Sequence, residues 1–138
     1  MKNRSELRDI AMKVLYQIDI LEDAKQPVDV NELIKEQLEI ENEFVNTLID
    51  GVISNKKKIK KLANDHLNGW TIDRLSKVDK AILEIGIYEL MYTDTPSIVS
   101  INEAVELSKQ YSDEKVTKMI NACLDKIYHE NEGTIDEQ

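Results

Sequence analysis

The sequence has little of the residue types that turns and disulfide frameworks require. Its 138 residues include four glycines, two prolines and one cysteine, and aromatic residues make up 5%. So few turn-forming residues argue against an all-β fold, in which turn signals recur about every ten residues. The single cysteine excludes an intrachain disulfide and a zinc site built from several thiolates, and it fits a reducing compartment.

The sequence also lacks a long apolar run and an excess of positive charge. No segment approaches the roughly 20 apolar residues of a membrane span, and no apolar signal-peptide core follows Met1. We therefore expect a cytoplasmic protein with no membrane partner. With 18 basic and 27 acidic residues the formal charge is −9, which argues against indiscriminate binding to nucleic acid, since such binding depends on neutralising phosphates. Any nucleic-acid role must use a local cationic patch.

Helical periodicity is abundant, and the chain has the usual length of one domain. Apolar residues recur at three- and four-residue spacing in the segments 5–21, 27–38, 41–66, 76–95, 100–111 and 112–127. We predict an all-α fold, a compact single-domain bundle of six or seven helices over residues 1–138. The basic arm at residues 1–4 and the acidic tail at residues 129–138 are expected to be flexible.

Several helix boundaries carry local signals. Ser100-Ile101-Asn102-Glu103 matches a capping box and predicts a helix that starts at Ser100. Ser112 is the predicted cap of the last helix, and Ser76, followed three residues later by Asp79, is another. Asn68-Gly69 is the clearest break in the middle of the chain.

The sequence contains no pattern typical of catalysis. His66 and His129 are the only histidines, and they are far apart without the spacing of a helix-borne metal site. Cys123 lies on an apolar stripe, where burial is expected rather than reactivity. Because a Gly-rich phosphate loop and a nucleophilic Ser elbow are also missing, we predict no catalytic residue, no metal site and no cofactor. The protein is not expected to be an enzyme.

Two basic features remain. Residues 56–61 contain five lysines in six positions, which fits either a nucleic-acid patch or the solvated back of a helix with its charges near the C-terminal end. The second interpretation is favoured, because Ile59 and Leu62 continue the apolar stripe. The other feature is the N-terminal arm, which carries Lys2, Arg4 and Arg8.

Several motifs resemble the NusB family of bacterial transcription antitermination factors. The segment 101–109, INEAVELSK, followed by 120–126, INACLDK, is similar to the paired signature of that family. Upstream, 78–83 with 88–90, and 8–12 with 15–16, match it in the same order. The resemblance therefore covers nearly the whole chain, from about residue 8 to residue 127.

The resemblance implies an all-helical RNA-binding protein that is not an enzyme. Members of the family pair with NusE, which is also a small-subunit ribosomal protein. Together they bind the boxA element of nascent ribosomal RNA transcripts, within an elongation complex that contains other Nus factors, and they suppress premature termination. Some members hide the RNA face in a homodimer, which is a further expected partner state.

Matching the family position by position implies the site residues. RNA contacts fall on the arm and on the start of the last helix, at Lys2, Arg4, Arg8, Lys115, Lys118 and Met119. Basic side chains grip phosphates, and unpaired bases need open faces and hydrogen-bonding edges. NusE contacts fall on Asp79 and Glu84, and Asn102 and Asn121 are either RNA contacts or structural amides.

The sequence also departs from the family pattern. Ser5 and Glu6 occupy positions that are commonly basic, which predicts weaker RNA affinity for this chain by itself. Met119 stands where a Phe is common, and a Met side chain cannot stack on a base as an aromatic ring does. Glu84 replaces a frequent Arg, and Lys115 stands where an acidic residue can occur.

Two alternatives to an RNA-binding antitermination factor stay open. One is a protein-only adaptor of the same fold. The other is an RNA methyltransferase, whose N-terminal domain resembles this one, although a chain of 138 residues is too short for the additional cofactor-binding domain. The favoured hypothesis predicts a cationic seam built from both ends of the chain, with Arg8 and Lys118 on the same side of the molecule.

Overall fold

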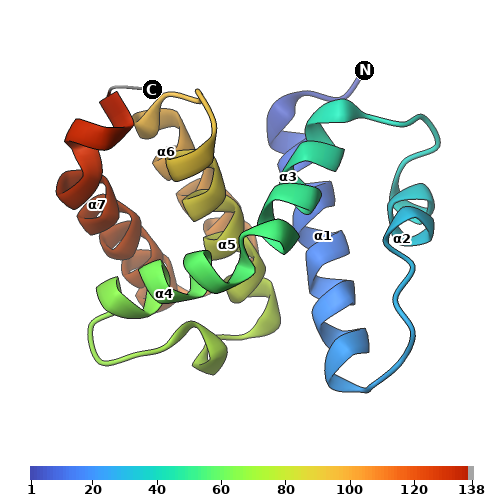
Figure 1. The fold of residues 1–138 in the computed structure, drawn as a ribbon, viewed down its shortest axis with the longest axis horizontal. Coiled ribbons are helices and arrows are strands. Elements are labelled where there is room, and N and C mark those ends of the chain that lie inside the picture. The colour runs from blue at the N-terminus through green and yellow to red at the C-terminus, as the bar shows by residue number, and fades with distance from the viewer. Residues whose placement is uncertain (137–138) are drawn as a thin grey trace.

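A computed structural model describes the backbone of residues 1–136 and the side chains of residues 1–132. The described residues form seven α-helices, one short 3-10 helix and no strand (Figure 1), which confirms the all-α prediction of six or seven helices. The helices are α1 (Arg4–Asp23), α2 (Val30–Gln37), α3 (Glu43–Ser54), α4 (Lys56–His66), α5 (Lys77–Tyr92), α6 (Ser97–Tyr111) and α7 (Glu114–Asp136), and the 3-10 helix is η1 (Ile72–Arg74).

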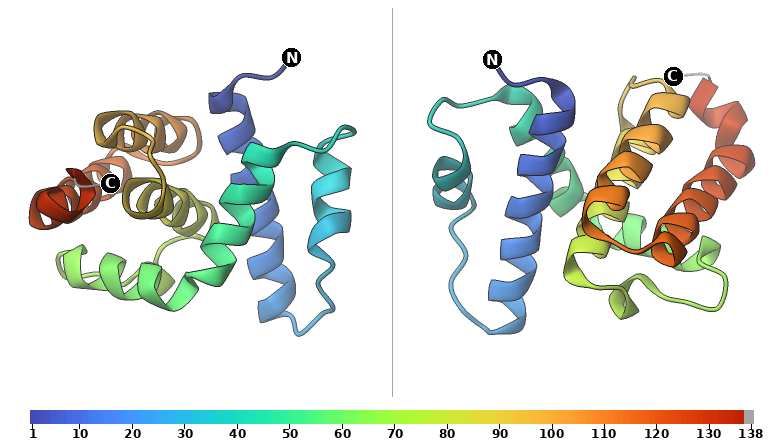
Figure 2. Two further views of the ribbon diagram at one scale, coloured as in Figure 1. Left: turned by 45° about the horizontal axis from the view of Figure 1, so that its top comes forward. Right: turned by 180° about the vertical axis from the view of Figure 1, so that it is seen from behind.

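Helix α5 lies at the centre of the bundle. It packs against α1 and α3 on one side and against α4, α6 and α7 on the other (Figures 1 and 2), and every residue from 81 to 90 is buried. Helix α2 packs on the outer side of α1. A Cβ added at Gly86 would lie 3.0 Å from Leu124 Cδ1 and 3.2 Å from Ala104 Cβ, so this glycine permits the close approach of α5 to its neighbours.

The predicted apolar stripes form the core. The buried apolar residues of α1 are those of the predicted stripe, Leu7, Ile10, Ala11, Val14, Leu15 and Ile18, together with Met12. The buried face of α7 consists of Ile120, Cys123, Leu124 and Ile127. The i, i+3, i+4 spacing predicted these faces, because residues at that spacing lie on one side of a helix and can be buried against the core together.

The start of α6 differs from the capping-box prediction. The helix begins at Ser97 behind Pro96, and the N–H of Ser100 donates to the carbonyl oxygen of Pro96 at 3.0 Å. Ser100 is therefore a buried residue of the first turns. Proline has a φ that suits a helix start and it cannot continue the preceding helix, so it overrides the weaker side-chain signal at Ser100.

The start of α7 also differs from the prediction, because the residue that caps the helix is one position later. The Oδ1 atom of Asp113 accepts the N–H of Val116 at 2.8 Å, so Asp113 caps α7 in place of the predicted Ser112. The helix then continues to Asp136, past the boundary predicted near Tyr128. Residues 129–136 of the predicted tail are thus helical, and residues 137–138 lie outside the described residues.

The predicted helix over 41–66 is two helices. It breaks at Asn55, whose φ and ψ of −112° and 19° are not helical and whose side-chain amide donates to the carbonyl oxygen of Gly51 at 2.8 Å. Lys56, Lys57 and Lys58 consequently occupy the first turn of α4, at the opposite end from the predicted one. Among the described helices, none is both long and apolar enough to cross a membrane.

Candidate functional site

The predicted basic arm, residues 1–4, leads directly into α1, whose first residue is Arg4. Asn3 caps the helix in a capping box with Glu6, whose N–H donates to Asn3 Oδ1 at 2.9 Å. Arg4 is therefore helical rather than part of a flexible arm, and it is exposed like Lys2. The guanidinium carbon of Arg4 lies 4.5 Å from the centroid of the Phe44 ring in α3, a cation–π contact that positions the charge.

Arg8 does not share this exposure. It is 4% exposed, and its Nε and Nη2 atoms donate to the two carboxylate oxygens of Glu89 in α5 at 2.6 and 2.8 Å. Glu89 is 1% exposed and also accepts the Thr95 hydroxyl at 3.2 Å. Burial by itself lowers the pKa of Arg8. The hydrogen bonds to Glu89 and its negative charge together outweigh this effect, so the pKa of Arg8 lies above its ordinary value.

The prediction that Arg8 grips a phosphate is therefore corrected. Both arms of its guanidinium are engaged with a buried carboxylate, so a phosphate could reach Arg8 only by breaking that pair. Arg8 also lies 5.3 Å from the Phe44 centroid. Its role in this structure is to hold α1 on α5 directly beneath the exposed Arg4.

Helix α6 lies beside α1 and brings acidic residues with it. The Ser5 hydroxyl donates to both carboxylate oxygens of Glu103, at 2.8 and 3.0 Å, and Arg8 Nη1 lies 3.8 Å from the nearer one. Farther along, the Tyr111 hydroxyl donates to Asp9 Oδ1 at 2.6 Å. Ser5, which departs from a commonly basic position, is thus one of the α1 residues that contact α6.

The start of α7 presents the second group of predicted RNA residues. Lys115 and Lys118 are exposed, and Met119 is half-buried. Lys118 Nζ lies 3.2 Å from Glu114, and both side chains are well exposed to solvent. An exposed ion pair of this kind is weak, so Lys118 can exchange its carboxylate for a phosphate.

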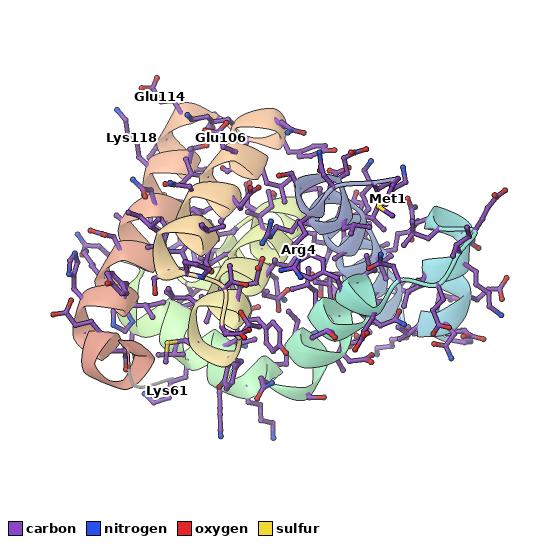
Figure 3. All side chains as sticks on the ribbon, turned by 90° about the horizontal axis from the view of Figure 1, so that it is seen from above. Met1, Arg4, Lys61, Glu106, Glu114 and Lys118 are labelled. Carbon is purple, nitrogen blue, oxygen red and sulfur yellow. The ribbon has the colours of Figure 1, made fainter. Side chains whose placement is uncertain are left out.

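The two groups flank α6 but do not form one continuous seam. Arg8 contacts Glu103 of α6, and α7 packs on the same helix through the 2.7 Å hydrogen bond between the Ser108 and Thr117 hydroxyls. Figure 3 shows Glu106 between Lys118 and Arg4, so the predicted seam is divided into two patches. We call Lys2 and Arg4 the arm patch, and Lys115 and Lys118 the α7 patch.

Asn102 and Asn121 lie on exposed positions of α6 and α7. Within residues 1–132, neither side chain makes a hydrogen bond to the protein, so neither caps a helix nor links the two helices there. Lys109 is seven residues after Asn102, two helical turns along the same face, and it is exposed. Its own partner is the exposed Glu106, at 3.1 Å.

The two predicted NusE-binding acids, Asp79 and Glu84, are both buried in α5. Asp79 Oδ2 accepts the Ser76 hydroxyl at 2.8 Å, and the described residues offer no hydrogen bond to its Oδ1. Glu84 is 7% exposed. Burial raises the pKa of Glu84 to about 7, although the charges of Lys56 and Lys80 lower it.

The lysine run on α4 is largely neutralised. Lys56, Lys60 and Lys61 lie within 3.9, 2.5 and 2.9 Å of the carboxylates of Glu22, Asp73 and Asp65. Lys57 and Lys58 are exposed. Such pairs are typical of a solvated helix face, which agrees with the favoured interpretation of the lysine run. The run lies at the N-terminal end of α4, however, and not at the predicted C-terminal end.

The described residues contain no cluster of three or more His, Cys, Asp or Glu side chains that could hold a metal ion. Burial raises the pKa of the Cys123 thiol to about 12, so the thiolate form is scarce at neutral pH. His66 Nδ1–H donates to the Leu62 carbonyl oxygen at 2.7 Å within α4. Its Nε2 atom lies 2.5 Å from a carboxylate oxygen of Glu130, and this contact links α4 to α7.

Comparison with known proteins identifies the family. The model of the NusB family matches residues 5–129. The chain belongs to the NusB family. A relative from Listeria monocytogenes, the transcription antitermination protein NusB, is 39% identical over 130 residues, which are 93% of this chain and 98% of that protein.

Solved structures of NusB proteins share the fold. The NusB structure from T. maritima has a TM-score of 0.80 and 30% identity, and the match covers 94% of this chain and 92% of that one. A crystal structure of the antitermination factors NusB and NusE in complex with dsRNA has a TM-score of 0.78 and 30% identity, and covers 92% and 96% of the two chains.

Proposed function

We propose that this NusB-family chain is a transcription antitermination factor that binds boxA of nascent ribosomal RNA transcripts together with NusE. The observation that carries the proposal is the family match over residues 5–129. The related NusB in a solved complex with NusE and dsRNA supports both classes of partner. The cytoplasm is the compartment this role requires, the role is non-enzymatic, and residues 1–138 act as one helical RNA-binding domain.

The arm patch and the α7 patch supply the phosphate contacts in this proposal. Lys2 and Arg4 are exposed at one end of α1, and Lys115 and Lys118 at the start of α7. Met119 follows Lys118 on α7, and Asn102 and Asn121 are exposed on α6 and α7; these three residues are assigned to base contacts. Arg8 supports the arm patch from below.

NusE is assigned a large share of the RNA affinity. The chain has a formal charge of −9, and Glu103 and Glu106 lie near the two patches, so each patch attracts RNA only locally. A basic partner beside α5, near Asp79 and Glu84, would reduce the repulsion of phosphates. Other Nus factors of the elongation complex bind the assembly, and a homodimer would be the resting state.

Binding of boxA RNA and of a scrambled RNA, with and without NusE, tests the proposal. We expect preference for boxA, strengthened by NusE, and about tenfold or greater loss in the double variant Arg4→Glu with Lys118→Glu. Lys57→Glu with Lys58→Glu changes the charge equally on α4 and serves as the matched control. A chain that shows no preference for boxA in either condition, while still binding NusE, would instead be the protein-only adaptor.

A further inference from the structure

A hollow of about 690 Å³ lies beside the arm patch, and Arg4 is the residue that the two share. Its walls come from the start of α1, the start of α3, the end of α5 and the residues that follow α5. Arg4, which stands at the centre of this end of the molecule in Figure 3, forms part of the rim. The volume is within the range of about 300 to 1,000 Å³ that is usual for small-molecule sites.

Three aromatic rings line the hollow, although the whole chain is poor in aromatics. Tyr88 and Tyr92, one turn apart on α5, stack with ring centroids 5.6 Å apart and ring planes 21° apart. Tyr88 is buried against α3, where a Cβ added at Gly51 would lie 2.1 Å from its ring. Tyr92 is 38% exposed, so the buried Tyr88 ring supports an accessible one.

Phe44 forms the third aromatic surface, and the Arg4 guanidinium lies over it. The hollow thus combines flat apolar faces with one exposed cation at its rim. Aromatic faces beside a basic side chain are the arrangement that proteins use to stack unpaired bases and hold the adjoining backbone.

The remaining charges on the wall are negative. Glu43 and Asp94 are both exposed, and both line the hollow. Their carboxylates repel a phosphate but accept hydrogen bonds from N–H groups. Among the bases, guanine presents two adjacent donors, its N1–H and its 2-amino group, to a carboxylate.

We propose that this hollow receives one unpaired guanine of the bound RNA. The ring stacks on Tyr92, a carboxylate of Glu43 or Asp94 accepts from the guanine edge, and Arg4 contacts the flanking phosphate. The proposal rests on the proposed RNA-binding function and adds a base-specific site to it. A protein side chain in the hollow is the competing occupant, and the experiment separates the two.

The test measures affinity of the NusE complex for one RNA and for copies in which each guanine in turn is replaced by inosine, which lacks the 2-amino group. We expect one position at which inosine weakens binding about tenfold. Tyr92→Ala should weaken binding of the guanine RNA about tenfold through lost stacking. Tyr92→Phe, which retains the ring, is the matched control. Asp94→Asn with Glu43→Gln should abolish the preference for guanine over inosine.

The outcomes distinguish this site from the function on which it rests. Crosslinking of 6-thioguanine, placed at the sensitive position, to Tyr92 or Phe44 would support the site, and thermal unfolding checks that each variant folds. If Tyr92→Ala leaves RNA affinity unchanged while Arg4→Glu with Lys118→Glu lowers it, the base site is wrong and the RNA function stands. If Tyr92→Ala weakens NusE binding in the absence of RNA, the hollow holds protein and the proposal is overturned. If the unaltered complex binds no RNA, the proposed function itself is wrong.

Discussion

The starts of α1 and α4 both carry basic residues, but their charges are held in different ways. At α1 the helix has a full capping box, Arg8 is locked to buried Glu89, and Arg4 rests on an aromatic ring. At α4 there is no side-chain cap, and the first turn holds three lysines but no acid, which opposes the helix dipole. The number of positive charges is therefore a poor guide to a site, and what each charge contacts is a better one.

The largest expected difference between the two regions is in stability. Arg8→Ala would leave Glu89 buried without its partner, so the free energy of unfolding should fall by about 3 to 5 kcal/mol. Lys60→Ala removes an exposed pair with Asp73 and should cost less than about 1 kcal/mol. Urea unfolding measures both. Equal effects would mean that the Arg8 pair is as solvated as the Lys60 pair, contrary to the structure.

Helix α4 packs against α5, which carries the buried carboxyl group of Glu84. This group should make the stability of the protein depend on pH. The folded pKa of Glu84, about 7, lies above the ordinary 4.5, so the folded chain binds this proton more tightly than the unfolded chain. The contribution of Glu84 to the free energy of unfolding is therefore complete below about pH 4.5, and it falls by about 3 kcal/mol as the pH rises to about 7.

The variant Glu84→Gln sharpens this prediction. Gln has nearly the same volume but does not titrate, so the fall in stability between about pH 4.5 and 7 should be reduced. Urea unfolding at several pH values measures the slope. Glu39→Gln, an exposed glutamate beyond α2, is the control and should leave the slope unchanged. An unaltered slope in Glu84→Gln would show that the carboxyl is solvated.

Substitutions at the starts of α1 and α4 should also differ in their effect on RNA affinity, although by less than they differ in their effect on stability. Arg4→Gln removes one proposed phosphate contact, so affinity for boxA RNA should fall several-fold and the slope of log affinity against log salt should decrease by about one. Lys57→Gln, on α4, should change neither quantity. Salt titrations of RNA binding provide the measurement, and an equal response of the two variants would place the RNA on α4 as well.

The smallest effect concerns the helix dipole. Lys57 lies in the first turn of α4 and is exposed, so Lys57→Glu should stabilise the protein by about 0.3 to 1 kcal/mol at low salt. The reverse change at α1, Glu6→Lys, should destabilise by somewhat more, because it also breaks the capping box. Thermal unfolding at low and high salt detects both changes, and high salt should diminish the electrostatic part.

Local patterns predicted the parts of the fold that depend on one helix at a time. The buried faces of α1 and α7 follow directly from apolar spacing, and the cap at Ser76 is present, with the N–H of Asp79 donating to its hydroxyl at 3.1 Å. Predictions were less accurate where neighbouring signals competed. Pro96 displaced the capping box at Ser100, and the break at Asn55 moved the lysine run to the other end of a helix.

The site was predicted as a set of sequence positions, but its geometry was not. Matching to the family located the arm and the start of the last helix, yet no local pattern separates Arg4 from Arg8, one turn apart on the same helix. Their environments differ because Glu89, 81 residues away, lies against only one of them. The sequence contained no signal for Phe44 either, because the arginines that lie over its ring come from another helix.

The sequence alone determined the fold class, the family and the faces of most helices, because helical periodicity and ordered motifs are properties of neighbouring residues. Only the tertiary structure decided which charges are accessible. Packing buried Arg8 with Glu89, left Arg4 exposed over Phe44 and placed Glu106 of α6 between Arg4 and Lys118. Burial and charge pairing depend on distances between elements, and those distances exist only after the helices have packed.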